Sequence, residues 1–197
     1  MTGETRLTGV ILAGGLGRRM GGADKGLQLL DGQALVQRVL ERFAPQVDEL
    51  LLNANQNLAR YQAFGYPVVA DQLPGFAGPL AGLQVAMAAA SHPLVATVPC
   101  DSPFLPVDLV TRLRAALLLH GADVATARTS DQRQPAFCVC RRALLPQLSS
   151  FLANGGRKLD WWQRTLKAVE VSFDDQPEAF RNINTAEELA NSGSRAR

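Results

Sequence analysis

Short apolar runs alternate with amphipathic segments along the first 120 residues. The runs typical of buried strands end at polar or turn-forming residues and span 7–12, 48–53, 66–70 and 93–99. Between them, apolar residues recur at helical spacing over 34–43 and 56–64, and in segments that begin at Pro79 and Pro106. This alternation predicts a three-layer α/β fold with a mostly parallel central sheet.

The pattern changes after residue 121. Strands are predicted over 122–126, 135–140 and 169–173, and we expect the second to run antiparallel at an edge of the sheet. Helices are predicted over 141–152, from Arg157 through Trp162, and over 185–191. We expect residues 1–197 to form a single domain, because the composition shows no break along the chain.

A glycine-rich stretch follows the first predicted strand and also carries cations. Its members are Gly14, Gly15, Gly17, Gly21 and Gly22, with Arg18, Arg19 and Lys25 between or after them. Glycine lets the backbone turn to positive φ and approach a ligand closely, so that N–H groups can form a nest for an anion. Fixed cations beside such a nest suit a polyphosphate. The stretch therefore predicts a triphosphate-binding loop.

Two common phosphate-binding motifs are absent from this loop. A P-loop needs Ser or Thr after its lysine, but Gly26 follows Lys25. The dinucleotide fingerprint would need a third glycine where Met20 stands. The alternative is a surface loop that is merely rich in glycine, and the cations argue against it.

Polar residues stand at the carboxyl ends of three predicted strands. These are Asn53, Asp71 and Asp101. In open α/β sheets this edge is where ligands bind, and a helix starting at Pro79 would point free N–H groups toward it. Asp101 follows the most apolar strand, at the position where a carboxylate ligand for magnesium is expected. A turn-capping role for Asp71 stays open, because Pro74 and Gly75 follow it.

Composition and charge narrow the choice of partners. The net charge is only +2 and the basic residues are scattered, which argues against nucleic acid as a partner. No apolar run reaches the ~18 residues of a membrane span, and residues 1–8 lack the apolar core of a signal peptide, so we expect a cytoplasmic protein without a membrane partner. The three cysteines have apolar neighbours typical of reduced core thiols, and they lack the spacing of a zinc site.

Motifs along nearly the whole chain resemble those of the molybdenum cofactor guanylyltransferases, a family of GT-A-like nucleotidyltransferases. The opening motif runs from Leu12 to Gly26 and contains Gly14-Gly15, Arg19 and Asp24-Lys25. The other matching segments are Asn53-Ala54-Asn55, Asp71, Gly78-Pro79-Leu80-Ala81-Gly82, Pro99-Cys100-Asp101, Gln134-Pro135 and Asn182-Ile183-Asn184. Each is weak alone, but their order and spacing together make the likeness specific.

This resemblance implies a Rossmann-like nucleotidyltransferase that moves GMP from GTP to molybdopterin, releases pyrophosphate and uses Mg²⁺. It implies a nucleotide-binding half of about residues 6–120, with nucleotide contacts from Leu12, Ala13, Gly14, Gly15, Lys25, Asn53, Asp71, Gly82 and Asp101. It implies catalytic roles for Lys25, Asp101 and Arg19, with Asp101 as the metal ligand. The acceptor-binding half, about residues 121–191, would contribute Arg157, Lys158, Asn182 and Asn184.

Alternatives remain for both the residues and the function. Arg157 and Lys158 can start a solvated helix, Asn182 and Asn184 can form turns, and Trp161 and Trp162 are more typical of packing than of pterin stacking. A molybdopterin cytidylyltransferase is a close rival, although that group tends to have Ala where Gly14 stands. Another small nucleotidyltransferase is a further rival. A non-catalytic nucleotide or pterin carrier would not need Asp101. The family also implies partner proteins that supply molybdopterin and mature molybdoenzymes.

Overall fold

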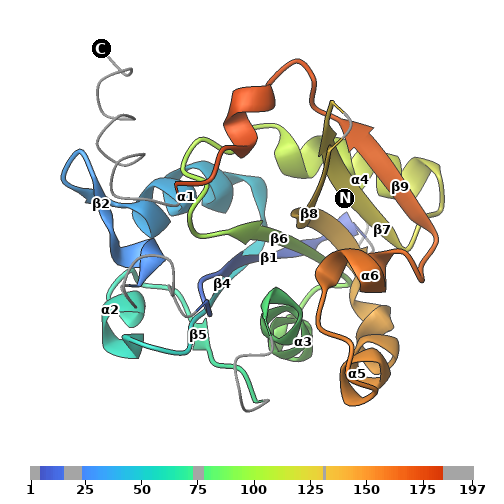
Figure 1. Ribbon diagram of the computed structural model, residues 1–197, viewed down its shortest axis with the longest axis horizontal. Coiled ribbons are helices and arrows are strands. Elements are labelled where there is room, and N and C mark those ends of the chain that lie inside the picture. Colours follow the sequence, from blue (N-terminus) through green and yellow to red (C-terminus); the bar gives the residue numbers. More distant parts are fainter. Residues whose placement is uncertain (1–4, 16–23, 73–77, 131, 184–197) are drawn as a thin grey trace.

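The computed structural model describes residues 5–15, 24–72, 78–130 and 132–183. Within these ranges a seven-stranded sheet has the order β5-β4-β1-β6-β8-β7-β9 (Figure 1). The strands are β1 (Leu7–Leu12), β4 (Glu49–Asn53), β5 (Val68–Val69), β6 (Leu94–Pro99), β7 (Val124–Thr129), β8 (Gln132–Arg141) and β9 (Ala168–Ser172). All of these run in the same direction except β8, which is antiparallel to both of its neighbours. The predicted α/β class with a mostly parallel sheet is confirmed.

The antiparallel strand β8 lies inside the sheet, so the expected edge position was wrong. It pairs with β6 on one side and with β7 on the other, and β9 extends the sheet further. Its residues Cys138, Val139 and Cys140 have no exposed surface. A continuous apolar run of this kind is typical of a strand covered on both faces, which is the physical reason for its internal place.

Helices cover both faces of the sheet. They are α1 (Leu35–Phe43), α2 (Leu58–Gln62), α3 (Pro79–Ala89), α4 (Leu109–Leu119), α5 (Leu145–Ala153) and α6 (Leu159–Gln163). Apolar side chains of α1 and α4 pack on one face, and those of α3, α5 and α6 pack on the other (Figure 1). Among the described residues, no helix combines the length and apolar character that a membrane span needs. The predicted helix over 185–191 lies outside the described residues.

Short elements complete the framework. The 3₁₀ turns are η3 (Lys25–Leu27), η4 (Ala44–Gln46), η5 (Arg142–Leu144) and η6 (Pro177–Phe180), and β2 (Leu29–Leu30) pairs with β3 (Gln33–Ala34). The hairpin turns at Asp31 and Gly32, whose φ angles are +51° and +79°, as an Asp-Gly pair favours. The three cysteines are buried and free, as expected of core thiols.

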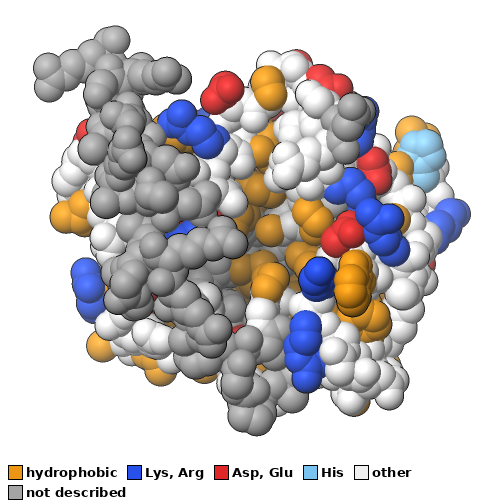
Figure 2. All heavy atoms as spheres, viewed as in Figure 1, with side chains coloured by type: hydrophobic (Ala, Val, Ile, Leu, Met, Phe, Trp, Pro, Cys, Tyr) orange, Lys and Arg blue, Asp and Glu red, His pale blue; other side chains and the backbone are white. Residues whose placement is uncertain are grey.

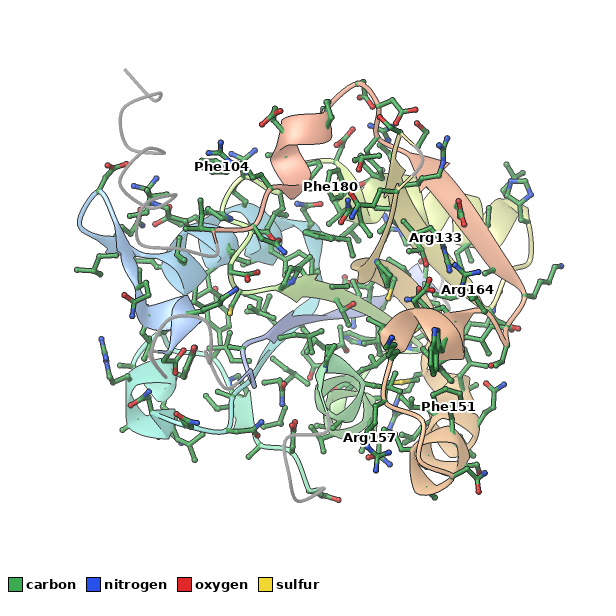
Figure 3. The ribbon with its side chains drawn as sticks, viewed as in Figure 1. Phe104, Arg133, Phe151, Arg157, Arg164 and Phe180 are labelled. Atoms are coloured by element: carbon green, nitrogen blue, oxygen red, sulfur yellow. The ribbon has the colours of Figure 1, made fainter. Side chains whose placement is uncertain are left out.

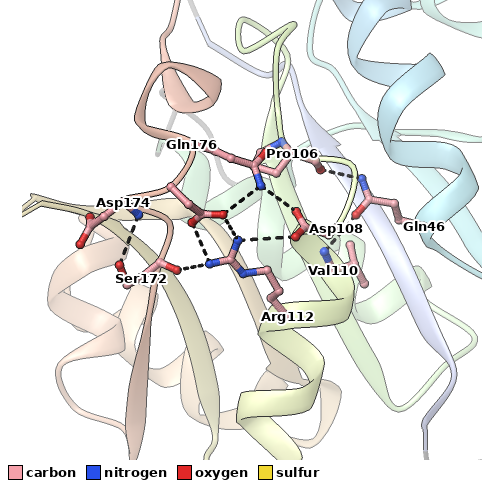
Figure 4. Close-up of polar contacts among 9 residues, drawn as sticks. Gln46, Pro106, Asp108, Val110, Arg112, Ser172, Asp174 and Gln176 are labelled. Atoms are coloured by element: carbon pink, nitrogen blue, oxygen red, sulfur yellow. Dashed lines mark hydrogen bonds and ion pairs between the residues drawn. The ribbon is translucent and has the colours of Figure 1, made fainter.

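A polar network ties the segment after β9 to the start of α4 (Figure 4). Arg112 donates to both carboxylate oxygens of Asp175 at 2.9 and 3.1 Å, and its guanidinium lies 3.9 Å from the centre of the Phe173 ring. Phe180 then packs edge-on against Phe173, with 5.1 Å between ring centroids. These contacts fix the path by which the chain returns toward the end of β6, where Ile183 N–H donates to the carbonyl of Asp101.

Candidate active site

The carboxyl ends of β1, β4 and β6 meet at one edge of the sheet. Leu12 is in register with Asn53 on one side and with Pro99 on the other. Beyond that point Ala13 N–H donates to the carbonyl of Asn53 at 2.8 Å, and Cys100 N–H donates to the carbonyl of Leu12 at 3.2 Å. The parallel pairing therefore brings the start of the glycine-rich stretch, at Ala13 and Gly14, to the edge where Asn53 and Asp101 lie, as the sequence predicted.

Lys25 and Asp101 form an ion pair at this edge. The Nζ of Lys25 lies 2.9 Å from Oδ2 of Asp101, and their side chains are only 22% and 11% exposed. The second carboxylate oxygen, Oδ1, is buried and accepts no hydrogen bond within the described part of the chain. A buried oxygen without a partner is costly unless something else binds it. The carboxylate thus has one oxygen held by a lysine and one available to a cation.

The donor set fits magnesium only if the substrate completes the coordination. Among the described residues, no group of three or more His, Cys, Asp or Glu side chains could hold a metal ion. Mg²⁺ prefers oxygen ligands, and it commonly binds one or two carboxylates together with substrate phosphates and water. Asp101 Oδ1 is suited to be the single protein ligand of such an ion.

Asp71 is held by two asparagine side chains. Asn53 Nδ2 donates to Oδ1 of Asp71 at 2.9 Å, and Asn55 Nδ2 donates to Oδ2 at 2.8 Å. Asp71 N–H in turn donates to Asn55 Oδ1 at 2.8 Å, and Asn55 Nδ2 also reaches the carbonyl of Gly14 at 3.1 Å. Asp71 therefore joins the ends of β4 and β5 to the loop after β1. A direct contact between Asp71 and a nucleotide stays a prediction.

The same asparagines explain two of the glycines. A Cβ atom on Gly82, in the first turns of α3, would lie 2.1 Å from Asn53 Oδ1. A Cβ atom on Gly14 would lie 2.7 Å from Asn55 Nδ2. Both distances are shorter than atoms can approach without displacement, so these positions need glycine for close packing. By contrast, a Cβ atom on Gly15 would meet no described atom within 4 Å.

The acceptor-side residues are separated by the fold into two places. Asn182 lies beside Asp101, because the buried hydroxyl of Ser102 donates to Asn182 Oδ1 at 2.5 Å. Arg157 lies at the end of α5, where Nη1 donates to the carbonyls of Leu152 and Gly156 at 2.8 and 2.7 Å. Figure 3 shows Arg157 between α3 and α5. Part of its guanidinium thus caps a helix, a role that sequence alone did not assign.

Lys158 pairs with an exposed tryptophan. Its Nζ lies 4.5 Å from the centre of the Trp161 ring, and Trp161 is 58% exposed. Its neighbour Trp162 has no exposed surface and packs in the core. The expectation that both tryptophans serve packing is therefore confirmed for Trp162 but not for Trp161. Figure 2 shows hydrophobic side chains on the floor of a hollow in this face, with basic side chains beside it.

A family model described as the MobA-like NTP transferase domain matches residues 9–169. The chain belongs to this family. The MobA-like chain is 48% identical over 194 residues to a molybdenum cofactor guanylyltransferase of Cupriavidus necator, with 96% of this chain and 97% of the relative covered. It is 49% identical over 193 residues to a protein of the same name from Bordetella petrii, with 96% and 98% covered. The resemblance inferred from the motifs is confirmed.

A solved structure supports the MobA-like fold. Molybdopterin-guanine dinucleotide biosynthesis protein A of Archaeoglobus fulgidus superposes with a TM-score of 0.79 at 23% identity, covering 95% of this chain and 97% of that one. At this identity the likeness concerns the fold alone. It places the mixed seven-stranded sheet among known nucleotidyltransferase architectures.

Some predicted residues of the MobA-like site lie outside the described ranges. These are Gly17, Arg18, Arg19, Gly21, Gly22 and Asn184. Two described residues, Tyr61 and Ser102, contact the site but were not predicted. Ser102 directly follows Asp101, which was the only local signal for it. Tyr61 stands on a short helix that follows the Asn53-Ala54-Asn55 motif, but it belongs to no motif itself and nothing in the sequence marked it.

Proposed function

We propose that this MobA-like protein transfers GMP from GTP to molybdopterin, releasing pyrophosphate and forming the molybdopterin guanine dinucleotide cofactor. The observation that carries the proposal is the Lys25–Asp101 pair, whose buried Asp101 Oδ1 lacks a partner among the described residues. It is supported by relatives named molybdenum cofactor guanylyltransferase at 48% and 49% identity, each matched over nearly its full length.

GTP would lie along the carboxyl edge of β1, β4 and β6. Residues 12–15 would follow the nucleotide with their backbone, since Gly15 leaves that backbone open to a ligand while Gly14 packs against Asn55. Helix α3 begins at Pro79, and the positive end of its dipole favours an anion. Lys25 and Arg19 would contact the phosphates, while Asn53, Asp71 and Gly82 would shape the rim that receives the nucleotide.

The proposed reaction joins two anions. An oxygen of the acceptor's terminal phosphate forms a bond to the α-phosphorus of GTP, while the bond from that phosphorus to the bridging oxygen breaks and pyrophosphate leaves with the electron pair. A phosphate is already ionised near neutral pH, so the site needs no strong base. Catalysis then rests on alignment and on neutralising charge, which Lys25 supplies from the protein. A Mg²⁺ ion held by Asp101 would add Lewis-acid neutralisation of the phosphate oxygens.

The acceptor would bind on the side of Asp101 where Asn182 lies. Asn182 is already held next to Asp101 by Ser102, and Arg157 and Lys158 lie on the segment that leads into α6. The positive charges of Arg157 and Lys158 suit an anionic acceptor at a place away from its attacking phosphate. Asn184 belongs to the same proposal. The product would then pass to proteins that mature molybdoenzymes, in the cytoplasm where we expect this protein to act.

The test is a direct assay with purified protein. GTP, MgCl₂ and molybdopterin are mixed, and both pyrophosphate and the dinucleotide product are measured. CTP, ATP and UTP are run in parallel, because faster transfer from CTP would reassign the protein as a cytidylyltransferase. GTP binding without pyrophosphate release, in the presence of intact acceptor, would favour the non-catalytic carrier.

A further inference from the structure

The hydroxyl of Tyr61 is buried against the loop that carries Lys25. Tyr61 lies on α2 and has no exposed surface, and its Oη donates to Oδ1 of Asp24 at 2.6 Å. Asn57, at the start of the same helix, donates from Nδ2 to Oδ2 of Asp24 at 3.0 Å. Both carboxylate oxygens of Asp24 are therefore held by side chains of α2, one turn apart. Hydrogen bonds to a charged group are among the stronger ones in proteins.

The same hydroxyl also packs against the residue on the other side of Lys25. A Cβ atom on Gly26 would lie 2.5 Å from Tyr61 Oη and 3.3 Å from Cys100 Sγ. Any side chain at position 26 would displace the hydroxyl, and glycine therefore permits the contact. Tyr61 Oη thus touches the residues before and after Lys25, and it fixes the backbone at the point where the lysine side chain leaves it.

Lys25 depends on such anchoring because its side chain is long. A lysine side chain has four rotatable bonds, so its ammonium reaches a defined place only when the backbone is fixed. The carbonyl of Asp24 accepts from Leu27 N–H at 3.2 Å, which closes the turn that contains Lys25. Burial is the main cause that raises the pKa of the Tyr61 hydroxyl above its usual value, and the hydrogen bond to Asp24 raises it further, so the hydroxyl remains a donor.

We propose that Tyr61 is a positioning residue for GMP transfer: through Asp24 and Gly26 it holds Lys25 so that the ammonium faces Asp101. The inference rests on the function proposed for the Lys25–Asp101 pair. Tyr61 itself does not touch the reacting groups. Its effect is exerted through Lys25, and it disappears when Lys25 is removed.

The first experiment follows the position of Lys25 without any substrate. The chain contains three lysines, so competitive acetylation followed by mass spectrometry measures Lys25 against the internal references Lys158 and Lys167. In Tyr61→Phe we expect Lys25 to be acetylated several-fold faster, approaching the rate in Asp101→Ala, where its partner is gone. The matched control is Tyr66→Phe, which removes the chain's other tyrosine hydroxyl and should leave the Lys25 rate unchanged.

A second variant keeps the inference testable if Tyr61→Phe folds poorly. Asn57→Gly removes the other hydrogen bond to Asp24 and retains the positive φ of +51° that position 57 adopts. We expect a smaller rise in the Lys25 rate than in Tyr61→Phe. An unchanged Lys25 rate in a folded variant of either kind overturns the proposal.

The activity readout separates positioning from a general loss of stability. In Tyr61→Phe, kcat should fall about tenfold at saturating GTP, the factor that one hydrogen bond to a charged group is worth. In a Lys25→Ala background the same substitution should cause no further loss of kcat. A merely structural defect would instead lower kcat by the same factor in both backgrounds. If the unaltered protein releases no pyrophosphate while Tyr61→Phe still exposes Lys25, the proposed function fails and the positioning role stands.

Discussion

The ammonium of Lys25 lies 2.9 Å from Oδ2 of Asp101, although 76 positions separate the two residues in the sequence. The lysine follows the glycine-rich loop and the aspartate follows the central strand β6. Only one oxygen of the carboxylate is used, because Oδ1 accepts no hydrogen bond from the described residues. This asymmetry suits a carboxylate placed between a lysine and a divalent cation.

Removal of the Asp101 carboxylate should strongly slow turnover without unfolding the protein. In Asp101→Ala we expect GMP transfer to fall by two to three orders of magnitude, about 3 kcal/mol or more of transition-state stabilisation, by analogy with the loss of one preorganised charge stabiliser. The measurement is the initial rate of pyrophosphate release against MgCl₂ concentration, with the thermal midpoint as a check on folding. EDTA should stop the unaltered protein, and added MgCl₂ should restore it. Near-normal turnover in the variant would remove Asp101 from the mechanism.

Two glycines should respond differently to alanine. Gly82→Ala would press a methyl group against Asn53 Oδ1 and disturb its bond to Asp71, so both stability and GTP affinity should fall, with about 1–3 kcal/mol lost from the free energy of unfolding. The methyl group added by Gly15→Ala would meet no described atom within 4 Å, so the free energy of unfolding should stay unchanged while GTP affinity falls. Urea unfolding and calorimetric titration with GTP measure the two effects. A Gly82→Ala protein as stable as its parent would contradict the packing described for Asn53.

The Arg112–Asp175 contact predicts a pH-dependent contribution to stability. Hydrogen bonds from Arg112 hold the pKa of the exposed Asp175 carboxyl below its usual value of about 3.8. The folded protein therefore binds this proton less readily than the unfolded chain, so the stabilisation is fully present above the unfolded pKa and is lost as the pH falls through the folded pKa. The difference in thermal midpoint between the parent and Asp175→Asn should persist at neutral pH and shrink in acid below about pH 4.

The control for this experiment is Glu178→Gln, which makes the same charge change on the next exposed turn. The Glu178 side chain has no ion pair or hydrogen bond to the described residues. The thermal midpoint of Glu178→Gln should equal that of the parent at every pH. An Asp175→Asn protein that also follows the parent at neutral pH would show that the Arg112 contact does not stabilise the fold.

The proposed acceptor role of Lys158 predicts a fluorescence signal. Trp161 is exposed beneath the Lys158 ammonium, while the chain's other tryptophan is buried. A pterin bound near Lys158 should therefore quench mainly Trp161. The measurement is emission during titration with the stable probe pterin-6-carboxylate, and Trp161→Phe should lose the quenching. Equal quenching in both proteins would place the pterin away from α6.

Local patterns in the sequence determined the elements and the chemistry they carry. The period of apolar residues predicted β1, β4 and β6, and the same pattern predicted the buried faces of α3 and α4. The parallel order implied that Asn53 and Asp101 would share an edge with the glycine-rich loop, since carboxyl ends of parallel strands lie together. Such inferences succeed because periodicity reports burial, and burial is what local sequence encodes directly.

Contacts between distant segments were decided only by the tertiary structure. The apolar run of β8 indicated burial but did not say that β7 and β9 would extend the sheet beyond it. Asp71 was open to a capping or a ligand role, and the fold placed both of its oxygens against asparagine amides. Tyr61 reaches Asp24 across 37 positions without any motif. A sequence pattern shows which side of an element is buried, whereas the partner on that side depends on how all the elements pack together.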